Sequence, residues 1–120
     1  MADINSYREL VVWKRSMELV VEAYKLVRYL PKEETYTLSN QIRRAVISIP
    51  SNIAEGNGRA STKDYLRFLS IARGSKYEFD TQLLICVELN YLTKEQISKA
   101  MLLSDEIGRM LNALIAKLGE

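Results

Sequence analysis

Basic side chains are the most conspicuous chemical groups in this chain of 120 residues, and they gather in its middle. Residues 42–76 contain seven lysines and arginines but only two carboxylates, whereas residues 1–41 are balanced and residues 77–120 carry an excess of three carboxylates. A local excess of cations can bind phosphate groups. The candidate nucleic-acid-binding residues are therefore Arg43, Arg44, Arg59, Lys63, Arg67 and Arg73.

The same cations have a second interpretation. Lys63 and Arg67 stand one turn apart on a predicted helix, which also fits a solvated helix face, or arginines that pair with the acidic segment of a neighbouring molecule. A single copy has too small a positive excess for tight binding, but an oligomer would repeat the patch and add weak sites through effective concentration. No motif for reading bases is present, so any binding should be mainly electrostatic and weakly sequence-specific.

The side chains that enzymes use most often are scarce in this sequence. It has no histidine, which removes the commonest general base near neutral pH and the commonest metal ligand. Its single cysteine, Cys86, falls on an apolar stripe and is expected to be a small buried side chain rather than a nucleophile. Residues 56–58 lack the strand-loop-helix context of a phosphate-binding loop. We therefore predict a non-catalytic protein without a cofactor or a metal site.

A smaller polar group surrounds a predicted turn after Pro50. It comprises Asn52, Glu55, Gly56 and Gly58, and the two glycines, which tolerate left-handed backbone angles, are expected to end the helix. In one interpretation Asn52 bonds the backbone near Pro50 and Glu55 pairs with Arg59 or Arg44. In the other, this group contacts a partner.

Four amphipathic segments must position these side chains. Apolar residues recur at helical spacing over residues 7–29, 36–56, 62 to 88 or 90, and from 94 onward. The expected caps are Ser6 with Glu9, Ser61 with Asp64, and Thr93 with Gln96. Because the connections are short, we predict an all-α protein, a single domain over residues 1–120 that forms an antiparallel (up-down-up-down) four-helix bundle.

The second predicted helix should continue through Pro50 with a kink. Ile42, Ala45, Ile49 and Ile53 keep their helical phase across the proline, although its ring removes one backbone donor and crowds a carbonyl. The kink is expected to tilt Asn52, Glu55 and Arg59 towards one end of the bundle. The polar group and the basic residues would then share one surface with Lys63 and Arg67.

Several blocks of the sequence resemble proteins encoded by intervening sequences in bacterial 23S rRNA genes, also called S23-like proteins. The most specific are SIPSNIAEG at 48–56 followed by Gly58-Arg59, and ARGS at 72–75; Val12-Trp13, QIRRA at 41–45 and Tyr91-Leu92 agree as well. The resemblance implies a four-helix bundle that assembles as a pentameric ring and whose function is poorly defined. A structural relative is the accessory variability protein of diversity-generating retroelements, a basic pentamer that binds nucleic acid and a reverse transcriptase.

The first and third predicted helices each carry two adjacent apolar stripes, which is more than a monomeric bundle needs. On the first helix, one stripe is Leu10, Trp13, Met17, Val20, Tyr24 and Val27, and the second is Val12, Leu19, Ala23, Leu26 and Leu30. The pattern alone fits either a wide core face or an additional interface. With the family resemblance, we expect a homo-oligomer that assembles through the second stripe.

Composition limits the class of protein. The chain is 48% apolar and 27% charged and has no apolar run of about 18 residues, so neither disorder nor a membrane span is expected. Its first residues do not resemble a signal peptide, and a single cysteine suits a reducing compartment, so we expect a cytoplasmic protein. The preferred hypothesis is an accessory factor that binds RNA or DNA. The alternative is an oligomeric scaffold for a protein partner, without nucleic acid.

Overall fold

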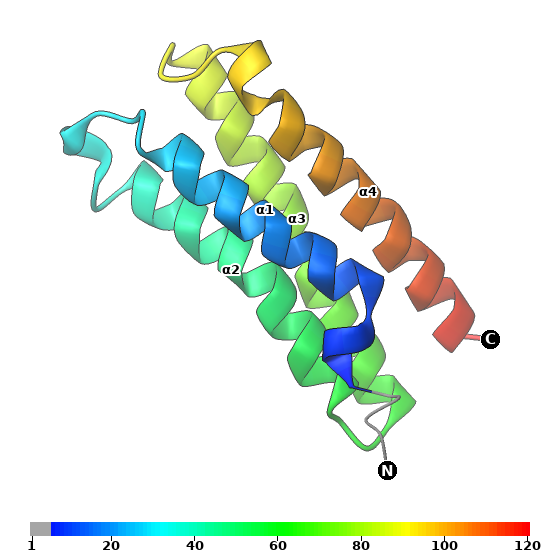
Figure 1. Cartoon of the computed structure of the whole chain (residues 1–120). Helices are drawn as coiled ribbons and strands as arrows, with labels where there is room; N and C mark the ends of the chain where they lie inside the picture. Colours follow the sequence, from blue (N-terminus) through cyan, green and yellow to red (C-terminus); the bar gives the residue numbers. More distant parts are fainter. Residues whose placement is uncertain (1–5) are drawn as a thin grey trace.

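The computed structural model describes residues 6–120, which form four long helices and no strand (Figure 1). The α-helices are α1 (Val11–Val27), α2 (Leu38–Asn57), α3 (Thr62–Glu88) and α4 (Lys94–Leu118), with short 3-10 helices η1 (Tyr7–Glu9) and η2 (Lys32–Glu34). The molecule measures 47 × 22 × 22 Å. These elements confirm the predicted all-α four-helix fold.

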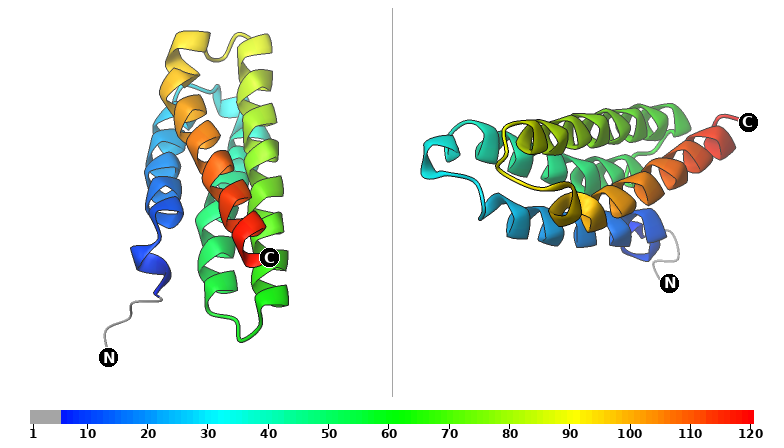
Figure 2. Two further views of the ribbon diagram at one scale, coloured as in Figure 1. Left: turned by 90° about the vertical axis from the view of Figure 1, so that its right-hand side faces the viewer. Right: turned by 90° about the horizontal axis from the view of Figure 1, so that it is seen from above.

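Each helix packs against two neighbours around a square. α2 and α3 make the most extensive contact, and within residues 6–120 the diagonal pairs α1–α3 and α2–α4 do not approach each other. On α2, Ser48 faces Ser75 and Gly56 faces Phe68 of α3, so the two helices run in opposite directions. The turn 58–61 therefore lies at one end of the bundle, and the connections 28–37 and 89–93 lie at the other (Figures 1 and 2).

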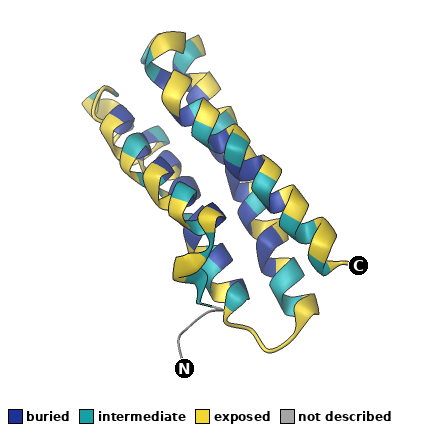
Figure 3. Ribbon diagram, turned by 45° about the vertical axis from the view of Figure 1, so that its right-hand side comes forward, coloured by how far each residue is buried: buried dark blue, intermediate teal, exposed yellow. Residues whose placement is uncertain are grey.

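One core runs along the bundle axis, and every helix contributes a buried stripe to it (Figure 3). The side chains with no exposed surface include Leu19, Ala23, Ile42, Val46, Ile49, Ile53, Leu69, Phe79, Leu83, Cys86, Ala100, Ile107 and Leu111. Ile42, Ile49 and Ile53 lie on the same side of α2 on both sides of Pro50. The predicted core positions of α2 are thus confirmed.

The prediction for the N-terminal part of the first helix is wrong. The chain forms η1, becomes extended at Leu10 (φ −73°, ψ 125°) and only then enters α1. The Ser6 hydroxyl accepts a bond from the Arg8 amide, and the expected capping box with Glu9 is not formed. The Tyr7 ring meets Trp13 edge-on with centroids 5.3 Å apart, and this contact requires the chain to fold back rather than continue as a helix.

The two stripes of α1 have roles opposite to those expected. The second stripe is buried in the core of the single chain at Leu19 and Ala23, so it is not available to another copy. Met17 and Tyr24 of the first stripe are about 40% exposed. Ser16 and Ala23 are small, which lets α1 approach its neighbours with this side inward.

Helix α2 continues through Pro50, as predicted, because residues 51–54 are helical. Asn52 donates from Nδ2 to the Ser48 carbonyl over 2.8 Å, which confirms its expected bond to the backbone near the proline. The kink stays a prediction. At the other helix starts, Ser61 caps α3 by accepting from the Asp64 amide, and Thr93 with Gln96 forms the predicted capping box of α4.

Candidate nucleic-acid interface

The structure separates the six predicted cations into different places. Only Arg59, Lys63 and Arg67 gather at the turn 58–61. Arg43 and Arg44 lie about 20 Å from that end of α2, given a rise of about 1.5 Å per residue. Arg43 donates to the Thr35 carbonyl over 3.3 Å. Adjacent positions on a helix point about 100° apart, so neighbours in sequence do not share a face.

Arg73 and Lys76 turn towards α4 rather than towards the other cations. Arg73 donates to the side-chain oxygen of Asn112 over 3.0 Å. Lys76 is buried against Gly108 and lies 2.9 Å from Asp80, whose carboxylate also accepts a bond from the Ser104 hydroxyl. This buried pair is internally neutralised, so Lys76 adds nothing to a phosphate-binding surface.

The remaining three cations form what we name the turn cluster: Glu55, Arg59, Lys63, Arg67 and Phe68. The guanidinium carbons of Arg59 and Arg67 lie 4.8 and 4.5 Å from the centre of the Phe68 ring. Arg59 also pairs with Glu55 over 2.8 Å, which confirms one of the two expected pairings. Arg67 has a longer contact of 3.8 Å with Asp64. Both guanidinium groups remain about half exposed, so they can still reach a ligand.

Gly56 explains why the ring lies so close to α2. A Cβ atom at this position would stand 2.6 Å from the Cβ of Phe68 and 3.1 Å from Cδ1 of Tyr65. No glycine in residues 6–120 has a positive φ, so Gly56 and Gly58 do not use the left-handed angles that glycine tolerates. Gly56 lies inside α2 and allows close packing, whereas Gly58 caps the helix with φ −82°.

Asn52 does not join the turn cluster, although it lies in the same half of the bundle. Its side chain also bonds the Ser48 hydroxyl, and this hydroxyl bonds that of Ser75 over 2.7 Å. Beside this chain of bonds is a polar groove of about 270 Å³ lined by Gln41, Arg44, Ala45, Ser48, Ser75 and Glu78. The predicted shared surface thus includes Glu55 and Arg59 but not Asn52, because Asn52 faces the α2–α3 interface.

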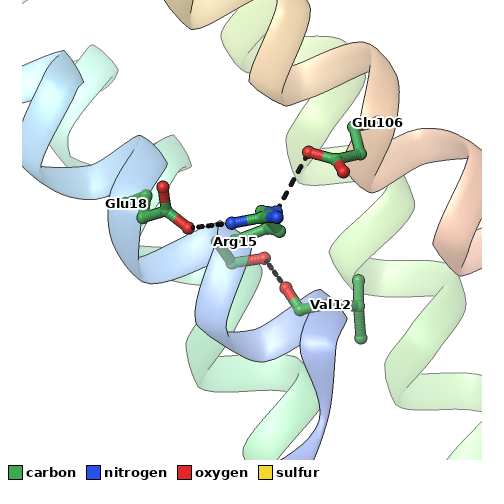
Figure 4. A network of polar contacts seen from close by, with 5 residues as sticks. Val12, Arg15, Glu18 and Glu106 are labelled. Carbon is green, nitrogen blue, oxygen red and sulfur yellow. Dashed lines mark hydrogen bonds and ion pairs between the residues drawn. The ribbon is translucent and has the colours of Figure 1, made fainter.

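A second ion-pair network ties α1 to α4 (Figure 4). Arg15 contacts Glu18 of its own helix over 2.7 Å and Glu106 of α4 over 3.2 Å. The hydrogen bond that Arg15 donates to Glu18, followed by the charge of Glu106, raises the pKa of Arg15 above its usual value. The Arg15 guanidinium is therefore already engaged in ion pairs within the bundle.

Cys86 is fully buried, as the sequence indicated. Burial, with a smaller effect from the charge of Glu34, raises the pKa of the Cys86 thiol to about 11. The thiol is therefore protonated near neutral pH, and this is unfavourable for a nucleophile. In the described part of the chain no three acidic, cysteine or histidine side chains are grouped as metal ligands, and no helix is long and apolar enough to cross a membrane.

A group of exposed aromatic residues lies at the opposite end of the bundle. Sequence reasoning centred on the middle third of the chain and did not single out Tyr24, Tyr29 and Tyr36. They alternate with Lys25, Arg28 and Lys32, an interleaving visible in the sequence itself. That interleaving was the signal that could have identified them.

A family model described as 23S rRNA-intervening sequence protein matches residues 8–113. The chain belongs to this family. A solved structure from Bacteroides thetaiotaomicron, described as a protein with unknown function from the S23 ribosomal protein family, is 31% identical with a TM-score of 0.81. The match covers 88% of this chain and 98% of that one. Comparison with curated proteins finds no match. The resemblance noted in the blocks at 48–59 and 72–75 is thus confirmed for this 23S rRNA-intervening sequence protein.

Proposed function

We propose that this 23S rRNA-intervening sequence protein is a non-catalytic, cytoplasmic accessory factor that associates with nucleic acid, chiefly RNA, through phosphate contacts. The family's description supports a link to ribosomal RNA. The residues that would bind phosphate are Arg59, Lys63 and Arg67 of the turn cluster. Binding would be weakly sequence-specific, because phosphate contacts carry no base information.

The stacking of two guanidinium groups on Phe68 is the observation that carries this proposal. A ring that holds the flat face of an arginine reduces its conformational freedom and leaves the N–H edge free for a phosphate. Lys63 adds a cation with no described carboxylate within 4.0 Å. Glu55 and Asp64 compete for the two arginines, so a single copy should bind weakly and lose affinity steeply with salt.

Oligomerisation belongs to the same proposal, since several copies would multiply this weak site. The family resemblance suggests a pentamer. Exposed apolar side chains on α1 and α4, including Val11, Val21 and Leu102, provide surface for contacts between copies. Light scattering coupled to size-exclusion chromatography measures the subunit number, and a monomer at micromolar concentration would contradict this part.

Binding to unrelated RNA and DNA molecules at rising salt tests the proposal. Reversing two charges with Lys63→Glu and Arg67→Glu should weaken binding to all sequences by similar factors. A double variant at Lys14 and Arg109, both exposed and carried by α1 and α4 rather than by α2 or α3, makes the same change in net charge and should retain most of the affinity. Absence of binding even at low salt would refute the proposal, and equal losses in the two double variants would exclude the turn cluster as the site.

A scaffold for a protein partner is the second candidate, and one surface favours it. A groove of about 420 Å³ between α1 and α4 is lined almost entirely by apolar side chains, among them Leu10, Val11, Met110 and Leu114. Isolation of complexes from the native host with and without nuclease distinguishes the candidates. A partner retained after nuclease treatment supports the scaffold, and one that is lost supports nucleic-acid association.

A further inference from the structure

The last part of α1 and the connection from α1 to α2 carry three tyrosines with large exposed surfaces. Tyr24 is 40% exposed, Tyr29 62% and Tyr36 90%, and Tyr36 is the most exposed large apolar side chain in the described residues. Tyrosine rings are usually packed against other groups, with only the hydroxyl in water. These three rings are therefore open to contact with a ligand. We name it the tyrosine surface, formed by Tyr24, Lys25, Arg28, Tyr29, Lys32 and Tyr36.

The cations of this surface are free of carboxylates. Among residues 6–120, no carboxylate oxygen lies within 4.0 Å of Lys25, Arg28 or Lys32. The nearby Glu34 is already engaged, since it accepts hydrogen bonds from Thr37 over 2.6 Å and from Tyr91 over 2.9 Å. In the turn cluster, by contrast, both arginines have a carboxylate one turn away.

The connection is also held in place. Arg43 bonds the Thr35 carbonyl, and Glu34 joins this connection to Tyr91 of the connection 89–93. The Tyr29 amide donates to Leu26 and continues the last turn of α1. A surface held in this way loses less conformational entropy on binding than a mobile loop.

A shallow groove adjoins the Tyr24 ring. It has a volume of about 280 Å³, an apolar floor of Val20 and Val21, and a rim formed by Tyr24, Lys25 and Arg28. Its size is close to the lower limit of small-ligand sites, about 300 Å³. An apolar floor beside two cations suits a nucleotide, because its base has flat apolar faces and is linked to an anionic phosphate.

We propose that the tyrosine surface binds single-stranded RNA, with unpaired bases stacked on Tyr29 and Tyr36 and phosphates held by Lys25, Arg28 and Lys32. Exposed rings can stack on unpaired bases, whereas bases within a duplex are already stacked on one another. This inference rests on the proposed nucleic-acid function, but it concerns the end of the bundle opposite the turn cluster (Figure 1). It adds a preference for single strands, which the turn cluster alone would not provide.

The test compares a labelled oligouridine of about 12 nucleotides with an RNA duplex of about 12 base pairs by fluorescence anisotropy. The double variant Tyr29→Leu, Tyr36→Leu keeps apolar bulk but removes the stacking rings. We expect its Kd for the single strand to rise by at least about tenfold, and its Kd for the duplex to change by less than about twofold, from the usual loss per stacked base. Tyr77→Leu is the matched control, because Tyr77 is 55% exposed but lies on α3, and it should leave both affinities unchanged.

Each outcome separates this inference from the broader proposal. If the native protein binds neither RNA at low salt, both are wrong. If it binds and the double variant binds the single strand equally well, the tyrosine surface is excluded while nucleic-acid association stands. If the double variant instead changes the subunit number and keeps its single-strand affinity, the rings contact a second copy and the inference is also wrong. Circular dichroism confirms that the variants fold.

Discussion

The two ends of the bundle both combine cations with aromatic rings, yet they use them differently. At the turn 58–61, Arg59 and Arg67 lie on a buried ring and each has a nearby carboxylate. At the connection 28–37, the rings of Tyr29 and Tyr36 are in solvent, and Arg28 and Lys32 have no described carboxylate partner. The arginines at the turn 58–61 are mostly engaged by contacts within the chain, whereas the cations at the connection 28–37 are not.

This difference shows that the number of charges in a segment does not reveal where a ligand could bind. The middle third of the chain has the larger positive excess, but Arg73 and Lys76 are used between α3 and α4. The first 41 residues have no net charge, yet Glu22 pairs with Lys99 of α4 and Glu34 bonds Tyr91. Pairing across helices, rather than composition, decides which cations remain available.

The largest expected effect concerns the tight packing at the turn 58–61. Gly56→Ala should lower the free energy of unfolding by about 2 to 3 kcal/mol, because the new Cβ would overlap Phe68 and neither backbone can move freely. Gly58→Ala is the control, since a Cβ there meets only carbonyl oxygens at 3.7 Å or more. Urea denaturation measures both, and equal stabilities would show that α2 and α3 can separate without cost.

A smaller effect is expected when the ring under the two arginines is replaced. Phe68→Leu should cost about 1.5 kcal/mol of stability and should also weaken RNA binding, because Arg59 and Arg67 lose the surface that orders them. Phe79→Leu, a change in the fully buried core, should lower stability without altering RNA affinity. Anisotropy titrations below the melting temperature compare the two. Identical affinities would mean that the stacked arginines do not contact RNA.

Gly74 lies between the two ends, and its replacement is expected to raise stability rather than lower it. It is exposed in the middle of α3, and a Cβ there would meet no atom within 4 Å. Gly74→Ala should therefore stabilise the protein by about 1 kcal/mol, the usual helix-propensity difference. Thermal unfolding of the native oligomeric state measures the change. A loss of stability would mean that another copy approaches α3 closely at this glycine.

The smallest effect is a pH dependence at the connection 28–37. Hydrogen bonds from Thr37, and then from Tyr91, lower the pKa of Glu34 below 4.5, so this contribution to stability is present above that pH and is lost as pH falls through the folded-state pKa. The bond to Glu34 raises the pKa of Tyr91 above 10, so the contribution is lost again in strong alkali.

Tyr91→Phe removes this bond and keeps the ring. Its stability should fall below that of the native protein near pH 7, and the difference should shrink at acid pH, as the pH falls through the lowered pKa of Glu34. Urea unfolding near pH 7 and at acid pH measures the difference. A constant difference across this range would show that Glu34 does not supply the stabilising charge.

The sequence by itself determined the helices and most of the core. Apolar spacing of three and four residues identified four helical segments, the phase of Ile42, Ile49 and Ile53 showed that α2 passes through Pro50, and Thr93 with Gln96 located the start of α4. These features depend on neighbours within one or two turns, so they can be read locally. The family blocks at 48–59 and 72–75 could be recognised from the sequence for the same reason.

Only the tertiary structure decided which side of α1 faces the core, what Gly56 does and which cations stay free. Each depends on residues distant in sequence: Ser16 and Ala23 against the neighbouring helices, Gly56 against Phe68, and Lys76 against Gly108. Helical periodicity gives the direction of a side chain around its own axis but not the partner it meets. That partner is set by the packing of four helices together, and with it the surface left for a ligand.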